Sequence, residues 1–387
     1  MLLTAFVKQT SPVAWSVCAT ATLEARVVRL GRNPCSDPFL SSKYLEDFFM
    51  SRHISFRSRA TAALLGLSLL ALSACGSDAA DSAAPAASSA PAASAPMNGG
   101  STPASAPSDV VPFSVTDPNG PVSLQAKPVR IISLSPTHTE MLFAIGAGAQ
   151  VVAVDDQSNF PAEVAAVKTD LSGFTPNIEA IATYKPDLVV IGDDSAKLSA
   201  QLGQLGIPVW YGPAATSLDD VYAQIEQLGV LTDHVADSAS LVATMSADVA
   251  SLVAEVPKLV APLTYYHELD PTYFSATSNT FIGQLYALAG LRNVADTAEA
   301  GNDYPQLNAE FIVSSNPDII FLADTKCCGE SAETVSVRDG WAAIAAVKSG
   351  HVVAMDDDIS SRWGPRVVDY LRSVVDAVKA AAPVTAG

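Results

Sequence analysis

The side chains best suited to chemistry are a pair of adjacent cysteines and two histidines. Cys327 and Cys328 follow the apolar segment 319–323, and after residue 75 each has only the other as a possible disulfide partner. Neighbouring Cα atoms lie about 3.8 Å apart, below the usual disulfide range, so a bond between adjacent cysteines is strained. We expect this vicinal disulfide to form and to stiffen a loop, with two reduced or buried thiols as the alternative.

The histidines could serve catalysis or metal binding. His138 stands beside Thr139 and Glu140, but a capping box at the start of a helix explains that pattern. The chain contains no nucleophile elbow, zinc-protease motif, P-loop or dinucleotide-binding turn in its proper context, so no enzyme is predicted. A receptor for free zinc or manganese ions is an alternative if His138 and His267 converge, although such sites usually take more histidines and carboxylates.

The elements that must position these side chains include a unit that occurs twice. Asn177-Ile178-Glu179-Ala180-Ile181 precedes Pro186-Asp187 and an apolar run, and Asn308-Ala309-Glu310-Phe311-Ile312 precedes Pro317-Asp318 and another. The copies are 131 residues apart, far more than the spacing of solenoid repeats. Each copy reads as a capped helix followed by a buried strand, which predicts two similar α/β lobes and a ligand cleft between them.

Apolar runs alternate with helical stretches along the rest of the chain, which predicts mostly parallel sheets covered on both faces. Strands are predicted at 129–134, 150–154, 207–211, 263–268 and 351–355, and helices at 141–145, 217–231, 280–289 and from 366. Residues 236–256 have helical periodicity and no Gly or Pro, so one helix about 30 Å long is predicted to join the lobes. The expected fold class is α/β, with two Rossmann-like lobes on this helix.

The N-terminal third predicts export and anchoring. Arg52, Arg57 and Arg59 precede the apolar run 61–72, which is too short to span a membrane. Leu72-Ser73-Ala74-Cys75 resembles a bacterial lipobox, so Cys75 is the expected lipidation site and the protein the expected extracytoplasmic lipoprotein. The expected segments are an upstream extension (1–49), a signal peptide (50–74), an Ala/Ser/Pro-rich tether (75–109), an N-terminal lobe (110–231), the linking helix (232–258) and a C-terminal lobe (259–387).

The charge balance excludes one class of partner. Of 22 basic and 40 acidic residues, 8 and 4 lie in residues 1–74, so the remainder carries 14 basic and 36 acidic residues and a net charge near −22. A nucleic-acid-binding protein needs a basic face, and this chain has no such excess of basic residues.

The chain resembles the substrate-binding proteins of bacterial ABC importers for vitamin B12, iron–siderophore and haem complexes. The resemblance rests on the segment 130–136 with Thr139-Glu140, on Asn159-Phe160-Pro161, on both repeated units, on the central helix and on the segment 362–366. It covers residues 110–382, and the vitamin B12-binding proteins resemble this chain most. It implies little hinge motion between lobes, a monomer without a resident cofactor, and a cobalt or iron chelate as ligand.

The resemblance also implies roles for single residues. Glu179 and Glu310 match glutamates that dock to permease arginines, with stabilisation of a helix N-terminus as the alternative. Loops at the strand ends supply the expected ligand-binding residues, among which an exposed Trp363 is the first choice. These residues are Ser135, Pro136, Thr137, His138, Asn159, Phe160, Tyr211, His267, Tyr273, Cys327, Cys328, Arg362 and Trp363.

Overall fold

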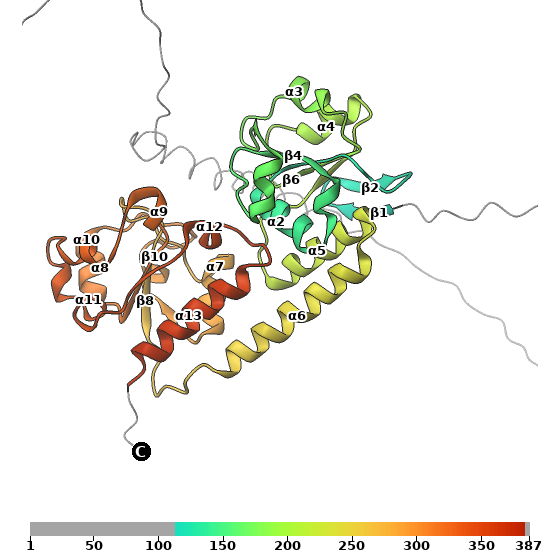
Figure 1. The fold of residues 1–387 in the computed structure, drawn as a ribbon. Helices are drawn as coiled ribbons and strands as arrows, with labels where there is room; N and C mark the ends of the chain where they lie inside the picture. The colour runs from blue at the N-terminus through green and yellow to red at the C-terminus, as the bar shows by residue number, and fades with distance from the viewer. Residues whose placement is uncertain (1–112, 384–387) are drawn as a thin grey trace, which may run out of the picture.

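The computed structural model describes residues 113–383 as two α/β lobes side by side (Figure 1). The predicted extension, signal peptide, lipidated Cys75 and tether lie outside these residues. No helix in the described part of the chain is long and apolar enough to cross a membrane.

The N-terminal lobe is built on a five-stranded parallel sheet with the strand order β5-β4-β3-β6-β7. The strands are β3 (Ile131–Leu134), β4 (Val151–Asp155), β5 (Lys168–Leu171), β6 (Leu188–Ile191) and β7 (Val209–Tyr211). Its helices are α2 (Pro136–Ala144), α3 (Ile178–Thr183), α4 (Leu198–Gln204) and α5 (Leu218–Thr232), with short 3-10 turns η2 (Ala147–Gln150) and η3 (Ala162–Ala166). An antiparallel hairpin of β1 (Phe113–Asp117) and β2 (Gly120–Leu124), which the sequence did not predict, packs against α5.

The C-terminal lobe is built on a four-stranded parallel sheet with the order β11-β10-β8-β9. The strands are β8 (Thr264–Glu268), β9 (Arg292–Asn293), β10 (Ile319–Leu322) and β11 (Val352–Ala354). Its helices are α7 (Phe281–Leu288), α8 (Ala309–Ser315), α9 (Thr325–Cys328), α10 (Ala332–Ser336), α11 (Ala345–Ser349), α12 (Asp357–Ser360) and α13 (Val367–Ala381), with 3-10 turns η4 (Ala295–Thr297) and η5 (Trp341–Ala343). Both sheets are therefore parallel, as predicted.

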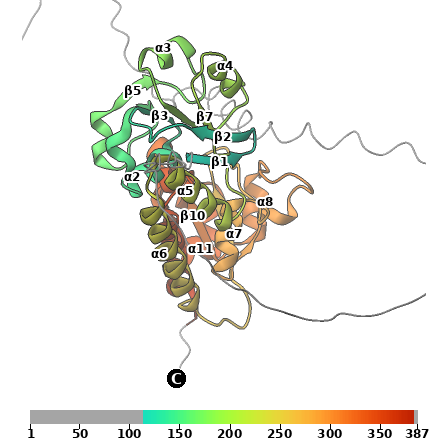
Figure 2. The same cartoon turned by 90° about the vertical axis from the view of Figure 1, so that its right-hand side faces the viewer.

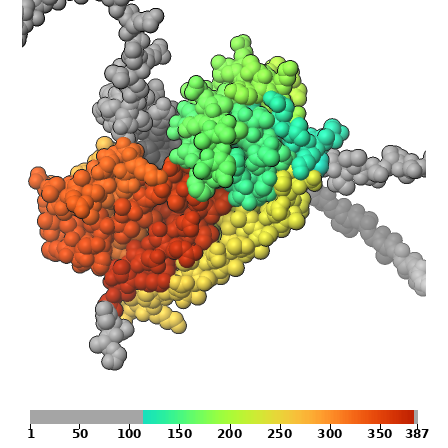
Figure 3. Space-filling view, viewed as in Figure 1, coloured from blue at the N-terminus to red at the C-terminus, as the bar shows by residue number. Residues whose placement is uncertain are grey.

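One long helix, α6 (Val235–Ala254), joins the lobes along a single side of the molecule (Figures 1 and 2). Helix α13 lies against α6, so that the last helix of the chain meets the linking helix (Figure 3). The two helices belong to one apolar cluster that also contains Ile131 of the N-terminal sheet and Phe321 of the C-terminal sheet. A core shared in this way ties the lobes together.

The repeated unit folds the same way in both lobes. Asn177 and Asn308 cap α3 and α8, each accepting a hydrogen bond from the backbone N–H three residues on. The aspartate after each break fixes the strand beside it: Asp187 accepts from the backbone N–H of Arg130, and Asp318 from that of Thr264. Each unit therefore places a capped helix and a buried strand next to the first strand of its sheet.

One sequence prediction about these elements is wrong. The predicted capping box at the start of α2 is absent, because the N-cap is Ser135 and its side chain makes no capping hydrogen bond. Thr139 bonds instead to Ser133 and Ser158, and Glu140 points to the other lobe.

Candidate functional site

A buried ion-pair cluster joins the lobes where the carboxyl end of the N-terminal sheet faces the C-terminal lobe. Glu140 of α2, with 2% of its side chain exposed, accepts hydrogen bonds from Arg362 and from Arg366. Arg362 also donates to the side chains of Asn159 and Asp358. A charge this deeply buried needs partners of opposite sign, so this Glu140–Arg362–Arg366 cluster holds the segment before α13 against α2.

The side-chain amide of Gln224 makes a second contact between the lobes. The Gln224 side-chain oxygen accepts hydrogen bonds from the Trp363 indole N–H and from His138 Nε2, each at 3.0 Å. Its side-chain nitrogen donates to the carbonyl of Pro213, which fixes the amide orientation. His138 Nε2 therefore carries the proton, and Nδ1 accepts from the hydroxyl of Ser135 at 2.8 Å.

Both predicted cleft histidines are buried and uncharged. Burial lowers the pKa of His138 to about 4 and that of His267 to about 3. His267 Nδ1 lies 2.9 Å from the Tyr286 hydroxyl, whereas its Nε2 has no hydrogen-bond partner in the structure. Among the described residues, no group of three or more His, Cys, Asp or Glu side chains could hold a metal ion.

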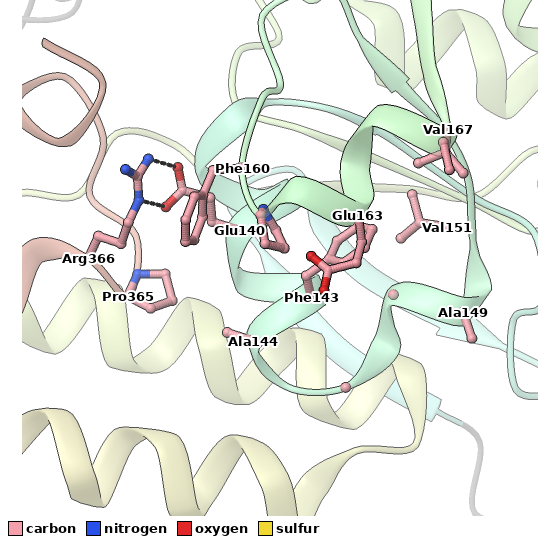
Figure 4. A pocket seen from close by; sticks show the side chains of 14 residues that line it. Glu140, Phe143, Ala144, Ala149, Val151, Phe160, Glu163, Val167, Pro365 and Arg366 are labelled. Atoms are coloured by element: carbon pink, nitrogen blue, oxygen red, sulfur yellow. Dashed lines mark hydrogen bonds and ion pairs between the residues drawn. The ribbon is translucent and has the colours of Figure 1, made fainter.

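Two hollows lie near the lobe junction. The smaller, about 70 Å³, is lined from both lobes, by Ala214 and Ala215 after β7 and by Phe281, Tyr304 and Trp363 among others. The larger, about 730 Å³, runs along the flank of the N-terminal lobe beneath η3. Figure 4 shows Phe160, Glu140 and Arg366 at the end of this groove that meets the C-terminal lobe.

Phe160 is the predicted aromatic residue most available to a ligand. It is 43% exposed, and the guanidinium of Arg366 lies 4.2 Å from its ring centroid. The ring thus stands at the lobe junction, where it is held by a cation–π contact.

A separate polar cluster lies under the carboxyl end of the C-terminal sheet. Arg338 donates to both carboxylate oxygens of Glu268 and to Glu330. Asp324 is fully buried, and neither of its carboxylate oxygens has a hydrogen-bond partner. Burial, with the negative charges of Glu268 and Glu330 nearby, raises the pKa of Asp324 to about 8, so this group is protonated at neutral pH.

The two cysteines lie on α9, immediately after Asp324. The Asp357 carboxylate accepts hydrogen bonds from the backbone N–H groups of Thr325, Lys326 and Cys327, which secures the start of this short helix. Cys327 is exposed and Cys328 half-buried. The vicinal disulfide stays a prediction.

The structure brings five of the predicted ligand-binding residues together in two hydrogen-bonded groups. Ser135, His138 and Trp363 meet through Gln224, whereas Asn159 and Arg362 meet beside Glu140. Tyr273 lies apart, against Trp341 and Arg338 in the C-terminal lobe. Pro136 and Thr137 form the first turn of α2, and half-buried Tyr211 ends β7.

The prediction that Trp363 is exposed is wrong. Its exposed fraction is 8%, because the indole packs edge-on to the His138 ring and donates to Gln224. Sequence reasoning also missed the roles of Glu140, Arg366 and Gln224. The only available signal was opposite charge at Glu140 and Arg366, which are 226 residues apart.

Glu179 and Glu310 lie in the first turns of α3 and α8 and are exposed. Figure 1 shows these helices on the outer parts of the two lobes, away from α6. The matching placement follows from the matching repeated units.

This architecture is typical of a two-lobed binding protein. Each lobe contains one parallel sheet, the lobes share an apolar core, and loops at the carboxyl ends of the strands line the junction between them. The chain belongs to the periplasmic binding protein family, whose profile matches residues 131–359. Members of this family are transport receptors and not enzymes, and this chain is a substrate-binding protein of an ABC transporter.

Three known proteins illustrate the similarity. The ABC transporter substrate-binding lipoprotein YvrC of Bacillus subtilis (strain 168) is 30% identical over 71% of this chain and 88% of its own length. A cobalamin-binding protein of Halobacterium salinarum (strain ATCC 29341 / DSM 671 / R1) is 30% identical over 68% of this chain and 74% of its own. The crystal structure of a possible iron-binding, periplasmic solute-binding protein from Staphylococcus epidermidis ATCC 12228 is 28% identical, with a TM-score of 0.58, over 65% of this chain and 99% of its own.

Proposed function

We propose that this protein is a lipid-anchored, extracytoplasmic receptor that captures cobalamin or a related metal chelate and delivers it to an ABC permease. The observation that carries the proposal is the junction between two lobes built on one core, in a chain 30% identical to a cobalamin-binding protein. Ligands of open parallel sheets bind beyond the carboxyl ends of the strands, which is where the two lobes face each other.

The ligand is proposed to lie between Phe160 and the C-terminal lobe. A corrin or a siderophore chelate is large and partly apolar, and the exposed Phe160 ring and the half-buried Tyr304 offer it flat apolar surface. Asn159, next to Phe160, is exposed, and its amide is held by Arg362 and Asp358. The buried His138 and Trp363 support the wall behind these residues through Gln224.

Glu179 and Glu310 are proposed to dock the loaded protein to arginines of the permease. Each is exposed at the start of a short helix in its lobe, so a permease dimer meets one carboxylate on each side. Stabilisation of the helix N-terminus, about 0.3–1 kcal/mol, explains each glutamate singly but not their matching positions.

An uptake assay in cells, combined with an affinity measurement on the purified protein, distinguishes a role in permease docking from a role in ligand binding. In cells that lack this protein, we expect wild type to restore uptake of labelled cyanocobalamin and the Glu179→Arg/Glu310→Arg variant to fail. The purified variant keeps its affinity for the ligand. The matched control reverses Glu226 on α5 and Glu255 after α6, both exposed, and keeps uptake. Normal uptake by the first variant contradicts docking.

Anchoring has its own test. We expect Cys75→Ser to release the protein from membranes into the soluble fraction, whereas Cys327→Ser leaves it membrane-bound. A Cys75→Ser protein that stays in the membrane fraction contradicts lipidation at this residue.

A receptor for ferric siderophores or haem is the second candidate. The Staphylococcus epidermidis structure, described as possibly iron-binding, favours it, because that protein shares the fold at 28% identity. Capture of free zinc or manganese has less support, because His138 and His267 are held in separate hydrogen-bonded positions.

A further inference from the structure

The segments that face the proposed ligand carry a strong excess of negative charge. We define the rim as the segments that run from the carboxyl end of each parallel strand to the next helix of five or more residues. These are residues 135, 156–161, 172–177, 192–197, 212–217, 269–280, 294–308, 323–331 and 355–366. The rim contains 12 acidic and 4 basic side chains. Even with Asp324 protonated, it keeps a net charge near −7 at pH 7.

The basic side chains of the rim are almost all neutralised by the protein itself. Arg362 and Arg366 are committed to buried Glu140, and Lys326 pairs with Asp356 at 2.7 Å and with Asp358 at 3.0 Å. Among the described residues, Lys197 is the one rim cation without an ion pair. Arg338, behind the rim, is held by Glu268 and Glu330.

Because Arg362 and Arg366 already pair with Glu140, their guanidinium groups are not available to bind an anionic ligand. Arg362 makes four hydrogen bonds, to Glu140, Asn159, Gln157 and Asp358. Turning its guanidinium towards a ligand leaves a carboxylate that is 2% exposed with one cation in place of two. Breaking a buried ion pair is strongly unfavourable, so the arginines stay with Glu140.

An anionic ligand therefore meets repulsion and finds no available guanidinium. The rim's field lowers the local concentration of anions and raises that of cations, most strongly at low ionic strength. The contacts that remain are the aromatic surface of Phe160 and Tyr304 and neutral polar groups such as the exposed amide of Gln157. Such contacts suit a ligand without net negative charge.

We propose that the cleft takes metal chelates of zero or positive net charge and rejects anionic ones. This inference rests on the proposed function, because it names the charge class of the chelate that the receptor delivers. It separates neutral corrinoids and neutral or cationic hydroxamate chelates from anionic catecholate chelates and from haem with its two propionates.

The test compares the affinities of three cobalamin derivatives that differ in net charge. The full-length protein is used, solubilised in detergent. The probes are cyanocobalamin, a derivative with one side-chain amide hydrolysed to a carboxylate, and a derivative with the same side chain extended to a terminal amine. Ferrioxamine B, ferric enterobactin and haem extend the series to iron. At low salt we expect the carboxylate derivative to bind about tenfold more weakly than the neutral and amine derivatives. In 0.5 M salt we expect this difference in affinity to become smaller, because salt screens the charge of the rim.

Two double variants test whether the rim carboxylates cause the difference in affinity between charged ligands. Asp156→Asn/Asp193→Asn removes two exposed rim carboxylates, and we expect it to narrow the gap between the amine and carboxylate derivatives. Asp248→Asn/Glu226→Gln makes the same change of net charge on α6 and α5, outside the rim, and leaves the gap unchanged.

The outcomes distinguish this inference from the proposed function. If the carboxylate derivative, ferric enterobactin or haem binds as tightly as the neutral chelates or more tightly, the inference is overturned and the receptor function stands. If none of the probes binds, both are overturned. Binding confined to the neutral and cationic probes supports both.

Discussion

Two buried carboxylates in this protein have opposite electrostatic surroundings. Glu140 has two arginine partners and joins the lobes, whereas Asp324 has no hydrogen-bond partner on either carboxylate oxygen and lies near two further carboxylates. Breaking a buried ion pair destabilises the folded state. An unpaired buried carboxyl group, by contrast, is more stable in its protonated, uncharged form. Replacing the carboxylate by an amide should therefore destabilise the fold at Glu140 and stabilise it at Asp324.

We expect Glu140→Gln to destabilise the fold by roughly 3 kcal/mol, because Arg362 and Arg366 lose the carboxylate that compensates their partly buried charges. Urea unfolding at pH 7 measures the change. Glu226→Gln, on the exposed face of α5, serves as the matched control and changes stability by less than about 0.5 kcal/mol. Equal stability of both variants contradicts the role of the cluster.

We expect Asp324→Asn to stabilise the fold in a pH-dependent way. The pKa of this carboxyl is raised from 3.8 to about 8, so between these values the folded state holds a proton that the unfolded state releases. Wild-type stability from this group therefore falls as pH rises from about 4 to 8, whereas asparagine does not ionise. The advantage of the variant grows over this window to at least about 1 kcal/mol at pH 8. Urea unfolding at pH 5, 6.5 and 8 measures it, and a difference independent of pH contradicts a protonated Asp324.

At the scale of elements, the repeated unit explains both what the lobes share and how they are capped. Helices α3 and α8 have six and seven residues, too short for stability on their own, so they depend on their asparagine caps and on packing. Each cap also positions the glutamate two residues on, which is the proposed docking residue.

We expect Asn177→Ala and Asn308→Ala each to cost about 1 kcal/mol, because each removes one capping hydrogen bond. The caps lie in different lobes, so the double variant loses the sum of the two single losses. Thermal unfolding measures both. Asn177→Asp and Asn308→Asp keep an acceptor and act as controls; stability unchanged by alanine contradicts the capping role.

The local elements could be predicted from sequence and the contacts between lobes could not. Apolar runs bounded by Gly and Pro located the strands and α6 to within a few residues, because those features depend on neighbours along the chain. Strands β5 and β9 and the β1–β2 hairpin lack such runs and were missed. Glu140 was assigned to a helix cap, since its true partners lie 222 and 226 residues away. For the same reason Trp363 was expected in solvent.

At the scale of the whole molecule, the lobes share one apolar core. Residues of α13 such as Leu371 pack in the same cluster as Ile131 of β3 and Phe321 of β10. A core that crosses the junction predicts that the lobes unfold together and move little against each other.

We expect Leu371→Ala to lower protection from hydrogen exchange equally in β3 and β10, by about 2–5 kcal/mol in the free energy of opening. Leu371 is fully buried, whereas the neighbouring Arg372 is exposed, so Arg372→Ala is the control. A loss confined to β10 contradicts a shared core and indicates lobes that unfold separately.

The central claim is that this receptor binds a metal chelate between its lobes, and equilibrium titration with cyanocobalamin tests it most directly. We expect calorimetry to give one site per chain, with binding weakened at least tenfold by Phe160→Ala. Leu205→Ala, which truncates an exposed side chain at the end of α4 outside the rim and both hollows, leaves binding unchanged. Absence of binding to cyanocobalamin together with tight binding of a ferric chelate contradicts cobalamin as the ligand. Absence of binding to either class contradicts the receptor function itself.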